Sequence, residues 1–233
     1  MLTHGAGVPR RLRQAVGIAL GALLAVVAAQ AATGATSGLD RRVFDALYHG
    51  QSPAPDGSPP GDSAVLDAVL PLASRLASIP LMLAATIAIA LVLAARGRRR
   101  DGWFVVGAVL PMGPASRALE ELFGRSSPFG QAGTSSFPSG HAMVSFAAAA
   151  AVTALSWPTR WRSAVLVGSA AFVGLVGVAV VSDSGHWPSD VVGGWLLAAG
   201  WVALLDRRVL RPSRASTQLS SPDASQPGPP AAG

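Results

Sequence analysis

The stretch SSFPSGHAM, residues 135–143, is a polar turn placed directly ahead of a long apolar run. Pro138 followed by Ser139 and Gly140 is typical of the first turn of a helix, where proline lacks only an amide hydrogen that would be unpaired anyway. The free amides of Ser139 and Gly140 would then point out of the helix start, at the positive end of the helix dipole. The stretch therefore predicts an anion site with His141 beside it.

A second polar turn, SGHWPSD at residues 184–190, precedes another apolar run. His186 and Asp190 are four residues apart, so that, if Pro188 begins a helix, the carboxylate comes back alongside the imidazole and fixes its tautomer. Such a pair is typical of a nucleophile or base with its orienting group. A single histidine at a helix end can equally be a cap or a packing residue, but two turns of matching design favour a shared site.

The composition predicts a membrane protein, because half of the 233 residues are apolar and only 13% are charged. The absence of cysteine excludes disulfides, thiolate metal sites and cysteine nucleophiles. All eighteen basic residues are arginine, which also excludes lysine chemistry. The net charge of +6 comes from short arginine clusters between apolar runs, without interleaved aromatic residues. Membrane topology explains this pattern better than nucleic-acid binding.

The order of apolar runs predicts an all-α fold, an integral membrane six-helix bundle. Residues 1–13 form a cytoplasmic lead, residues 14–206 the membrane domain, and residues 207–233 a basic and then disordered cytoplasmic tail. The expected spans are residues 14–33, 80–95, 103–119, 141–157, 163–181 and 187–205. The competing interpretation of the first span is a cleaved signal peptide, because Ala29-Gln30-Ala31 resembles a cleavage site.

The segments between the spans carry further expectations. Residues 34–63, rich in proline and glycine, are expected to form a solvent loop, and residues 64–78 a helix at the membrane interface. Pro111, Gly113 and Pro114 interrupt the third span, which predicts that this span borders the functional pocket.

The arginines indicate the topology. Thirteen fall on the side of the two termini and five on the other, which favours a multi-pass protein of the cell membrane with both termini cytoplasmic. Both polar turns then lie on the extracytoplasmic face, so we expect the active-site loops there. A membrane lipid could reach them laterally from the outer leaflet.

The motifs Phe137-Pro138-Ser139-Gly140-His141 and His186-Trp187-Pro188-Ser189-Asp190 resemble the second and third signature motifs of the type 2 phosphatidate phosphatase and vanadium haloperoxidase superfamily. The resemblance covers residues 103–205 and implies a lipid phosphatase that needs neither metal nor cofactor. It implies the following roles: His186 as the nucleophile that becomes a phosphohistidine, Asp190 as the partner of its other ring nitrogen, His141 as the acid for the leaving group, and Ser139 and Gly140 as ligands of the phosphate oxygens.

The sequence departs from this family at its three cationic phosphate ligands. Glu120 and Ser127 occupy the positions of the lysine and arginine of the first motif, and Val180 that of the arginine of the third. Arg117 and Arg125 could substitute as phosphate-binding residues; the alternative is a salt bridge with a nearby glutamate or simple solvation. A cation on a transferring phosphoryl group stabilises it by several kcal/mol, so these losses matter.

Two hypotheses therefore remain for the function. The first is a phosphatase acting on phosphatidate or an isoprenoid diphosphate in the membrane. The second is a catalytically impaired relative, a pseudoenzyme that binds a lipid headgroup or a partner in the same pocket. A haloperoxidase is disfavoured because those enzymes use the same cations to hold vanadate, and a transporter because few ionisable residues lie inside the spans.

Overall fold

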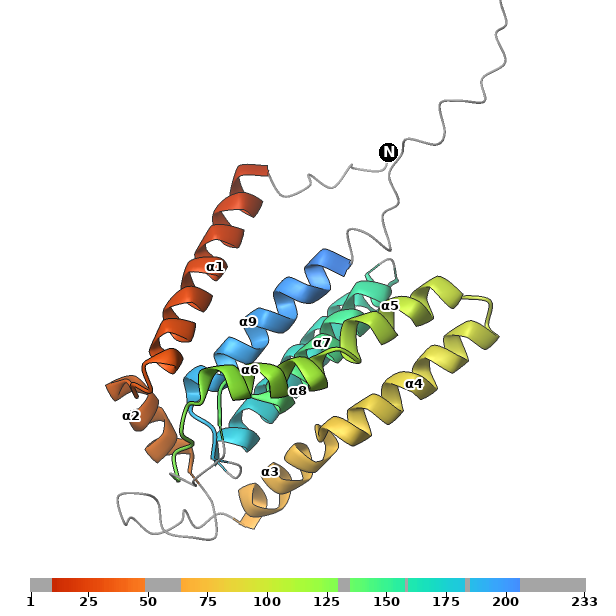
Figure 1. The fold of residues 1–233 in the computed structure, drawn as a ribbon. Coiled ribbons are helices and arrows are strands. Elements are labelled where there is room, and N and C mark those ends of the chain that lie inside the picture. The colour runs from red at the N-terminus through yellow and green to blue at the C-terminus, as the bar shows by residue number, and fades with distance from the viewer. Residues whose placement is uncertain (1–9, 49–63, 130–134, 158, 183–184, 206–233) are drawn as a thin grey trace, which may run out of the picture.

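The computed structural model describes residues 10–48, 64–129, 135–157, 159–182 and 185–205, and in these ranges the chain is helical (Figure 1). The only extended pairing in the described ranges is an isolated bridge between Ser126 and Ser135. The helices are α1 (Arg10–Ala32), α2 (Gly38–Leu47), α3 (Ala64–Leu76), α4 (Ile79–Ala95), α5 (Arg99–Val109), α6 (Met112–Phe123), α7 (Gly140–Ser156), α8 (Arg162–Ser182) and α9 (Pro188–Leu205).

The helices make a membrane bundle, which confirms the predicted fold class. Helices α8 and α9 are each long and apolar enough to cross a bilayer, and α3 with α4 would make a third span broken by a 55° bend. Two shorter apolar helical segments, Ile18–Ala32 and Gly140–Ser156, belong to α1 and α7. The expectation of six spans remains a prediction, because length and apolarity identify at most three in the described ranges.

Helix α7 lies at the centre of the bundle and packs against α4, α5, α6, α8 and α9. Its alanines 142, 147 and 151 are fully buried, and so are Phe104 and Val109 of α5. In a bilayer, helices associate by close packing rather than by burial from water, and small side chains allow their backbones to approach. Helix α1 packs along α9 at one side of the bundle, while α3 and α4 lie at the other (Figure 1).

The expectation of a solvent loop at residues 34–63 is wrong for its first part. Helix α2 begins after Ser37, whose hydroxyl accepts a hydrogen bond from the Asp40 amide. The apolar residues of α2 fall on one face, and Phe44 is only 1% exposed. The proline-rich composition of the later residues, which lie outside the described ranges, concealed this amphipathic turn.

The third span is not one continuous helix. Helix α5 ends at Val109 and α6 begins at Met112, with Pro111 as its N-terminal cap. Proline has no amide hydrogen to continue the hydrogen-bond ladder, so the helix is interrupted there. The helix expected within residues 64–78 is present as α3, which bends sharply into α4, while its place at the membrane interface remains a prediction. Helix α6 continues to Phe123, beyond residue 119, where the third span was expected to end.

Candidate functional site

The two motifs lie at one end of the bundle, where α8 ends and where α7 and α9 begin. The amide of Ser139, just before α7, donates to the carbonyl of Asp190 in the first turn of α9 (3.1 Å). Gly194 lets the two helices approach, because a Cβ added there would lie 2.9 Å from the Ser139 carbonyl oxygen. Gly140 is similarly constrained, since its Cβ would lie 2.7 Å from the Ser116 hydroxyl of α6. The prediction that the interrupted third span borders the site therefore agrees with this contact.

His186 is held in a defined orientation in the loop before α9. Its Nδ1 lies 3.0 Å from the carbonyl oxygen of Ser136, which directly precedes the motif Phe137–His141. The side chain is 15% exposed. Burial lowers the pKa of His186 to about 4, with the Ser136 carbonyl opposing this shift and the charge of nearby His141 adding to it. The imidazole is therefore neutral near pH 7, and Nδ1 bonded to a carbonyl must carry the hydrogen, which leaves Nε2 with its lone pair.

Asp190 does not hold the His186 ring as predicted. Its Oδ2 lies 3.9 Å from His186 Nδ1, beyond hydrogen-bond distance, and instead accepts a hydrogen bond from the Trp187 amide (2.8 Å). The helical geometry behind the prediction is present, since α9 begins at Pro188. The carboxylate therefore secures the backbone that follows His186, while the Ser136 carbonyl orients the ring.

The start of α7 matches the predicted anion site in part. Ser139 is the N-cap, with its hydroxyl 3.5 Å from the Ala142 amide. The Ser139 amide is not free, contrary to the prediction, because it donates to Asp190. The amides of Gly140 and His141 form no hydrogen bond with any other described residue. These two amides can therefore donate hydrogen bonds to an anion at the positive end of the helix dipole.

Arg125 lies at the middle of a buried ion-pair network. Its side chain is 1% exposed. Nη1 donates to Asp190 Oδ1 (2.5 Å) and to Ser189 Oγ (2.7 Å), and Nη2 donates to Asp40 Oδ2 (3.0 Å) and to the Ala35 carbonyl (3.2 Å). One cation thus faces two carboxylates. The role of Arg125 as a phosphate ligand remains a prediction, but both terminal nitrogens are engaged within the protein.

Asp40 is the residue of this network that the sequence analysis missed. It is 3% exposed and lies on α2. Its carboxylate accepts from the Ser189 amide (2.9 Å) and hydroxyl (2.7 Å), and from Gln30 of α1 (3.1 Å). Asp40 thereby joins α1 and α2 to the first turn of α9. The available signal was Ser37 followed by Asp40 three residues later, a helix-start pattern.

Arg117 lies on α6, one residue after Ser116, whose hydroxyl lies near Gly140. Its side chain is 76% exposed and pairs with Glu120, Nη1 to Oε2, at 3.2 Å. This is the salt bridge that the sequence analysis gave as the alternative to phosphate binding. Exposed pairs of this kind contribute little to stability, about 0 to 1 kcal/mol, so the arginine can leave it at small cost. Arg117 is also close enough for its charge to act on His141.

Val180 occupies an environment that suits no cation. It is fully buried in an apolar cluster with Phe44, Val176 and Val191. Aromatic side chains extend this cluster: the Phe44 ring lies 5.5 Å from that of Trp187. Placing an arginine at this position would bury a charge without a partner, which is strongly unfavourable.

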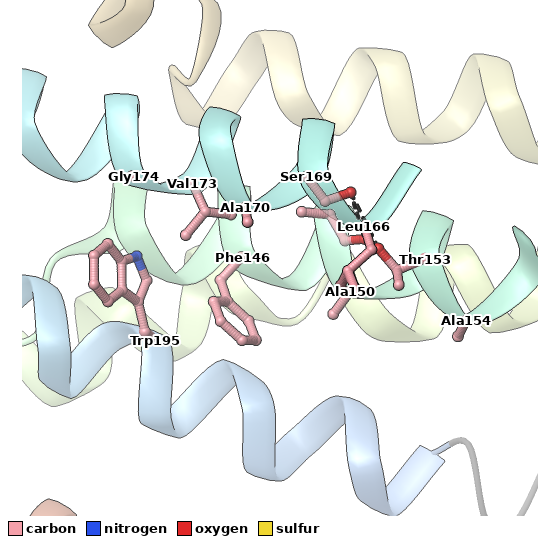
Figure 2. A pocket seen from close by; sticks show the side chains of 11 residues that line it. Phe146, Ala150, Thr153, Ala154, Leu166, Ser169, Ala170, Val173, Gly174 and Trp195 are labelled. Carbon is pink, nitrogen blue, oxygen red and sulfur yellow. Dashed lines mark hydrogen bonds between the residues drawn. The ribbon is translucent and has the colours of Figure 1, made fainter. Parts of the chain in front are cut away.

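An apolar groove of about 560 Å³ lies between α7, α8 and α9, lined by residues that include Phe146, Leu166 and Trp195 (Figure 2). On α8, Val176 and Val180 of the apolar cluster lie between the groove residues, which end at Gly174, and the end of the helix at Ser182. The groove is therefore separate from the candidate site. In the described ranges, no three histidine, aspartate or glutamate side chains gather as metal ligands would.

Comparisons with known proteins agree with the fold and with the family that the motifs resemble. The family model described as the PAP2 superfamily matches residues 15–211. A solved structure, described as the first transmembrane PAP2 type phosphatidylglycerolphosphate phosphatase from Bacillus subtilis, superposes with a TM-score of 0.69. It shares 18% sequence identity, and the match covers 85% of this chain and 98% of that one, a likeness of fold. No curated protein matches the chain.

Proposed function

The chain belongs to the PAP2 superfamily of membrane phosphatases, and from this premise we propose that it hydrolyses a lipid phosphate through a phosphohistidine on His186. The observation that carries this proposal is the orientation of His186. With Nδ1 bonded to the Ser136 carbonyl and the pKa lowered to about 4, the ring presents a neutral nucleophilic nitrogen at neutral pH.

The reaction proceeds in two displacements. Nε2 of His186 attacks phosphorus, the bond to the leaving oxygen breaks, and His141 gives that oxygen a proton. Positive charge grows on the His186 ring during the attack, and the Ser136 carbonyl stabilises it through Nδ1–H. The neutral His141 then takes a proton from a water molecule that attacks the phosphohistidine, which releases phosphate and restores both rings.

The negative charge of the phosphoryl group requires hydrogen-bond donors, and the start of α7 has two backbone amides that can donate. The amides of Gly140 and His141 point out of the helix with the dipole behind them, and Ser139 caps the same turn. Arg117 is the cation available to replace the missing family ligands, because its pair with Glu120 is exposed. Arg125 contributes by fixing Asp190 and Ser189 at the start of α9.

The substrate class proposed is a phosphatidate, an isoprenoid diphosphate or, as in the name of the Bacillus protein, a phosphatidylglycerolphosphate. We place the site on the extracytoplasmic side of a six-span domain at residues 14–206, with both termini in the cytoplasm, on the distribution of arginines. A substrate would then reach the two motifs from the outer leaflet.

The test is phosphate release by the full chain in detergent, with each of the three lipids and a chelator present. We expect turnover, its loss in His186→Ala and a severe loss in His141→Ala. The control is His4→Ala, which removes a histidine distant in sequence from both motifs and should leave the rate unchanged. An unchanged rate in His186→Ala would remove this mechanism.

The pairing of both predicted arginine ligands supports a second candidate function. Arg125 is committed to Asp40 and Asp190, and Arg117 contacts Glu120. If neither arginine is free to stabilise the transferring phosphoryl group, the chain would bind a lipid phosphate without hydrolysing it. This candidate predicts that lipid phosphate raises the unfolding midpoint of the native chain although no turnover is measured with any of the three lipids.

A further inference from the structure

The turn between α4 and α5 presents a fixed cluster of arginines. Gly97 has a φ of +77°, and its amide donates to the Ala94 carbonyl (3.0 Å), while the Arg98 amide donates to the Leu93 carbonyl (2.8 Å). This pair of bonds is the usual glycine-dependent end of a helix. Arginines 96, 98, 99 and 100 therefore lie on an ordered turn at the opposite end of the bundle from the start of α9 (Figure 1).

Most of the positive charge on this turn has no internal partner. Arg98 pairs with Asp101 at 2.6 Å, the only salt bridge that the described part of the chain forms here. Arg96, Arg99 and Arg100 are exposed and have no carboxylate partner among the described residues. Three cations thus remain for an external anion at the start of α5.

An apolar groove of about 410 Å³ runs from this cluster along α4 and α5. Arg99 is the one charged residue that lines it; the others are apolar, with Ala94 on α4 and Trp103 on α5. Gly102 allows the two helices to approach here, because its added Cβ would lie 3.0 Å from the Ala90 carbonyl oxygen. Trp103 is 73% exposed, as expected for an aromatic residue at a membrane interface.

We propose that this groove binds one anionic phospholipid, with an acyl chain between α4 and α5 and the headgroup phosphate on Arg99. A guanidinium binds phosphate with two parallel hydrogen bonds, and Arg99 has no carboxylate partner among the described residues. A lipid fits better than a soluble anion, because the rest of the groove is apolar and lies along membrane helices.

This lipid is not the substrate of the proposed reaction. Helix α4 has 17 residues and is therefore about 25 Å long. Its first turn, at Ile79, lies against Gly140 in the candidate site, whereas Arg99 follows its last turn. The proposal is thus independent of hydrolysis and concerns a resident lipid at the other end of the bundle.

The test is native mass spectrometry of the full chain in detergent with an equimolar mixture of phosphatidylglycerol and phosphatidylcholine of identical chains. We expect one retained lipid with a preference for phosphatidylglycerol. Arg99→Gln should reduce that preference about fivefold, the effect of one arginine near an anionic headgroup. Ala94→Phe, which fills the groove, should remove the retained lipid of either kind.

The matched control is Arg160→Gln. Arg160 also lies beside a tryptophan, 5.0 Å from the Trp161 ring, in the α7–α8 connection, but lines neither apolar groove. The site is supported if Arg160→Gln keeps the preference that Arg99→Gln loses, with equal unfolding midpoints of the lipid-free variants. An equal effect of the two substitutions, no effect of Arg99→Gln, or displacement of the lipid by inorganic phosphate would overturn the proposal.

Discussion

Replacement of Arg125 by methionine tests the buried network that supports the start of α9. The substitution keeps an unbranched side chain but removes the arginine that, among the described residues, pairs with the carboxylates of both Asp40 and Asp190. Those carboxylates are 4% and 0% exposed, so each loses its counter-ion inside the protein. Removing one partner of a buried pair costs about 3–5 kcal/mol, and we expect Arg125→Met to lower the free energy of unfolding by that amount.

The matched control is Arg117→Met, which removes the other arginine predicted to bind phosphate. Its pair with Glu120 is exposed to solvent, so the loss should stay below about 1 kcal/mol. Both variants can be unfolded in mixed detergent micelles and followed by circular dichroism. In the same assay Asp40→Asn, placed in the Arg125→Met chain, removes one uncompensated charge and should recover about 1–3 kcal/mol through coupling.

The outcome decides between two roles for Arg125. A large loss that Asp40→Asn partly recovers means that the arginine supports the site through the fold. If Arg125→Met were no less stable than Arg117→Met, the network would not carry this energy, and the structural role would be refuted. A loss of activity alone would then favour direct phosphate binding.

Two further predictions concern His186 and the contact between α7 and α9. The neutral His186 ring is the nucleophile, and its pKa is about 4 in the fold. We therefore expect protonation of His186 to lower kcat/KM only as the pH falls through about 4. A fall in kcat/KM near pH 6.5 that is due to His186 would contradict this. In the unfolded chain His186 binds this proton near pH 6.5, so the free energy of unfolding should decrease as the pH falls from 6.5 to 4. The decrease should be smaller in His186→Gln, as measured by unfolding at each pH. The added methyl group of Gly194→Ala should displace the Ser139 carbonyl and reduce kcat severalfold. Gly200→Ala, with open space around its Cβ, should not change kcat. Equal kcat values in the two variants would argue against the contact between Gly194 and Ser139.

The sequence predicted the parts of the fold that depend on local pattern. Long apolar runs predicted helices that the structure has, of which α8 and α9 are long and apolar enough to cross a bilayer, and Pro188 correctly marked the start of α9. Proline and glycine in the third run indicated a break, which the structure has between α5 and α6. The amphipathic α2 was missed, because its short apolar face borders a proline-rich segment whose composition outweighed it.

The structure brings the predicted residues His186, Asp190 and Ser139 to one end of the bundle, but their hydrogen bonds did not follow from the sequence. The spacing of four residues brings Asp190 toward His186. The Asp190 carboxylate nevertheless accepts hydrogen bonds from Arg125 and the Trp187 amide, and the His186 ring is bonded to the Ser136 carbonyl. Arg125 lies 65 residues from Asp190 and Ser136 lies 50 residues from His186, so no local pattern encodes these two partners. The same holds for Asp40, which reaches α9 across 149 residues of sequence.

The proposed reaction is tested most directly by looking for the phosphorylated intermediate. The full chain, mixed with a lipid phosphate, denatured at neutral to alkaline pH after a short interval and digested, should yield a peptide with one phosphate group on His186. His141→Ala should still accumulate this adduct from a substrate with a good leaving group, because water attack then lacks its base. A phosphate on another residue, or phosphate release with no adduct on His186 at any interval, would contradict the account.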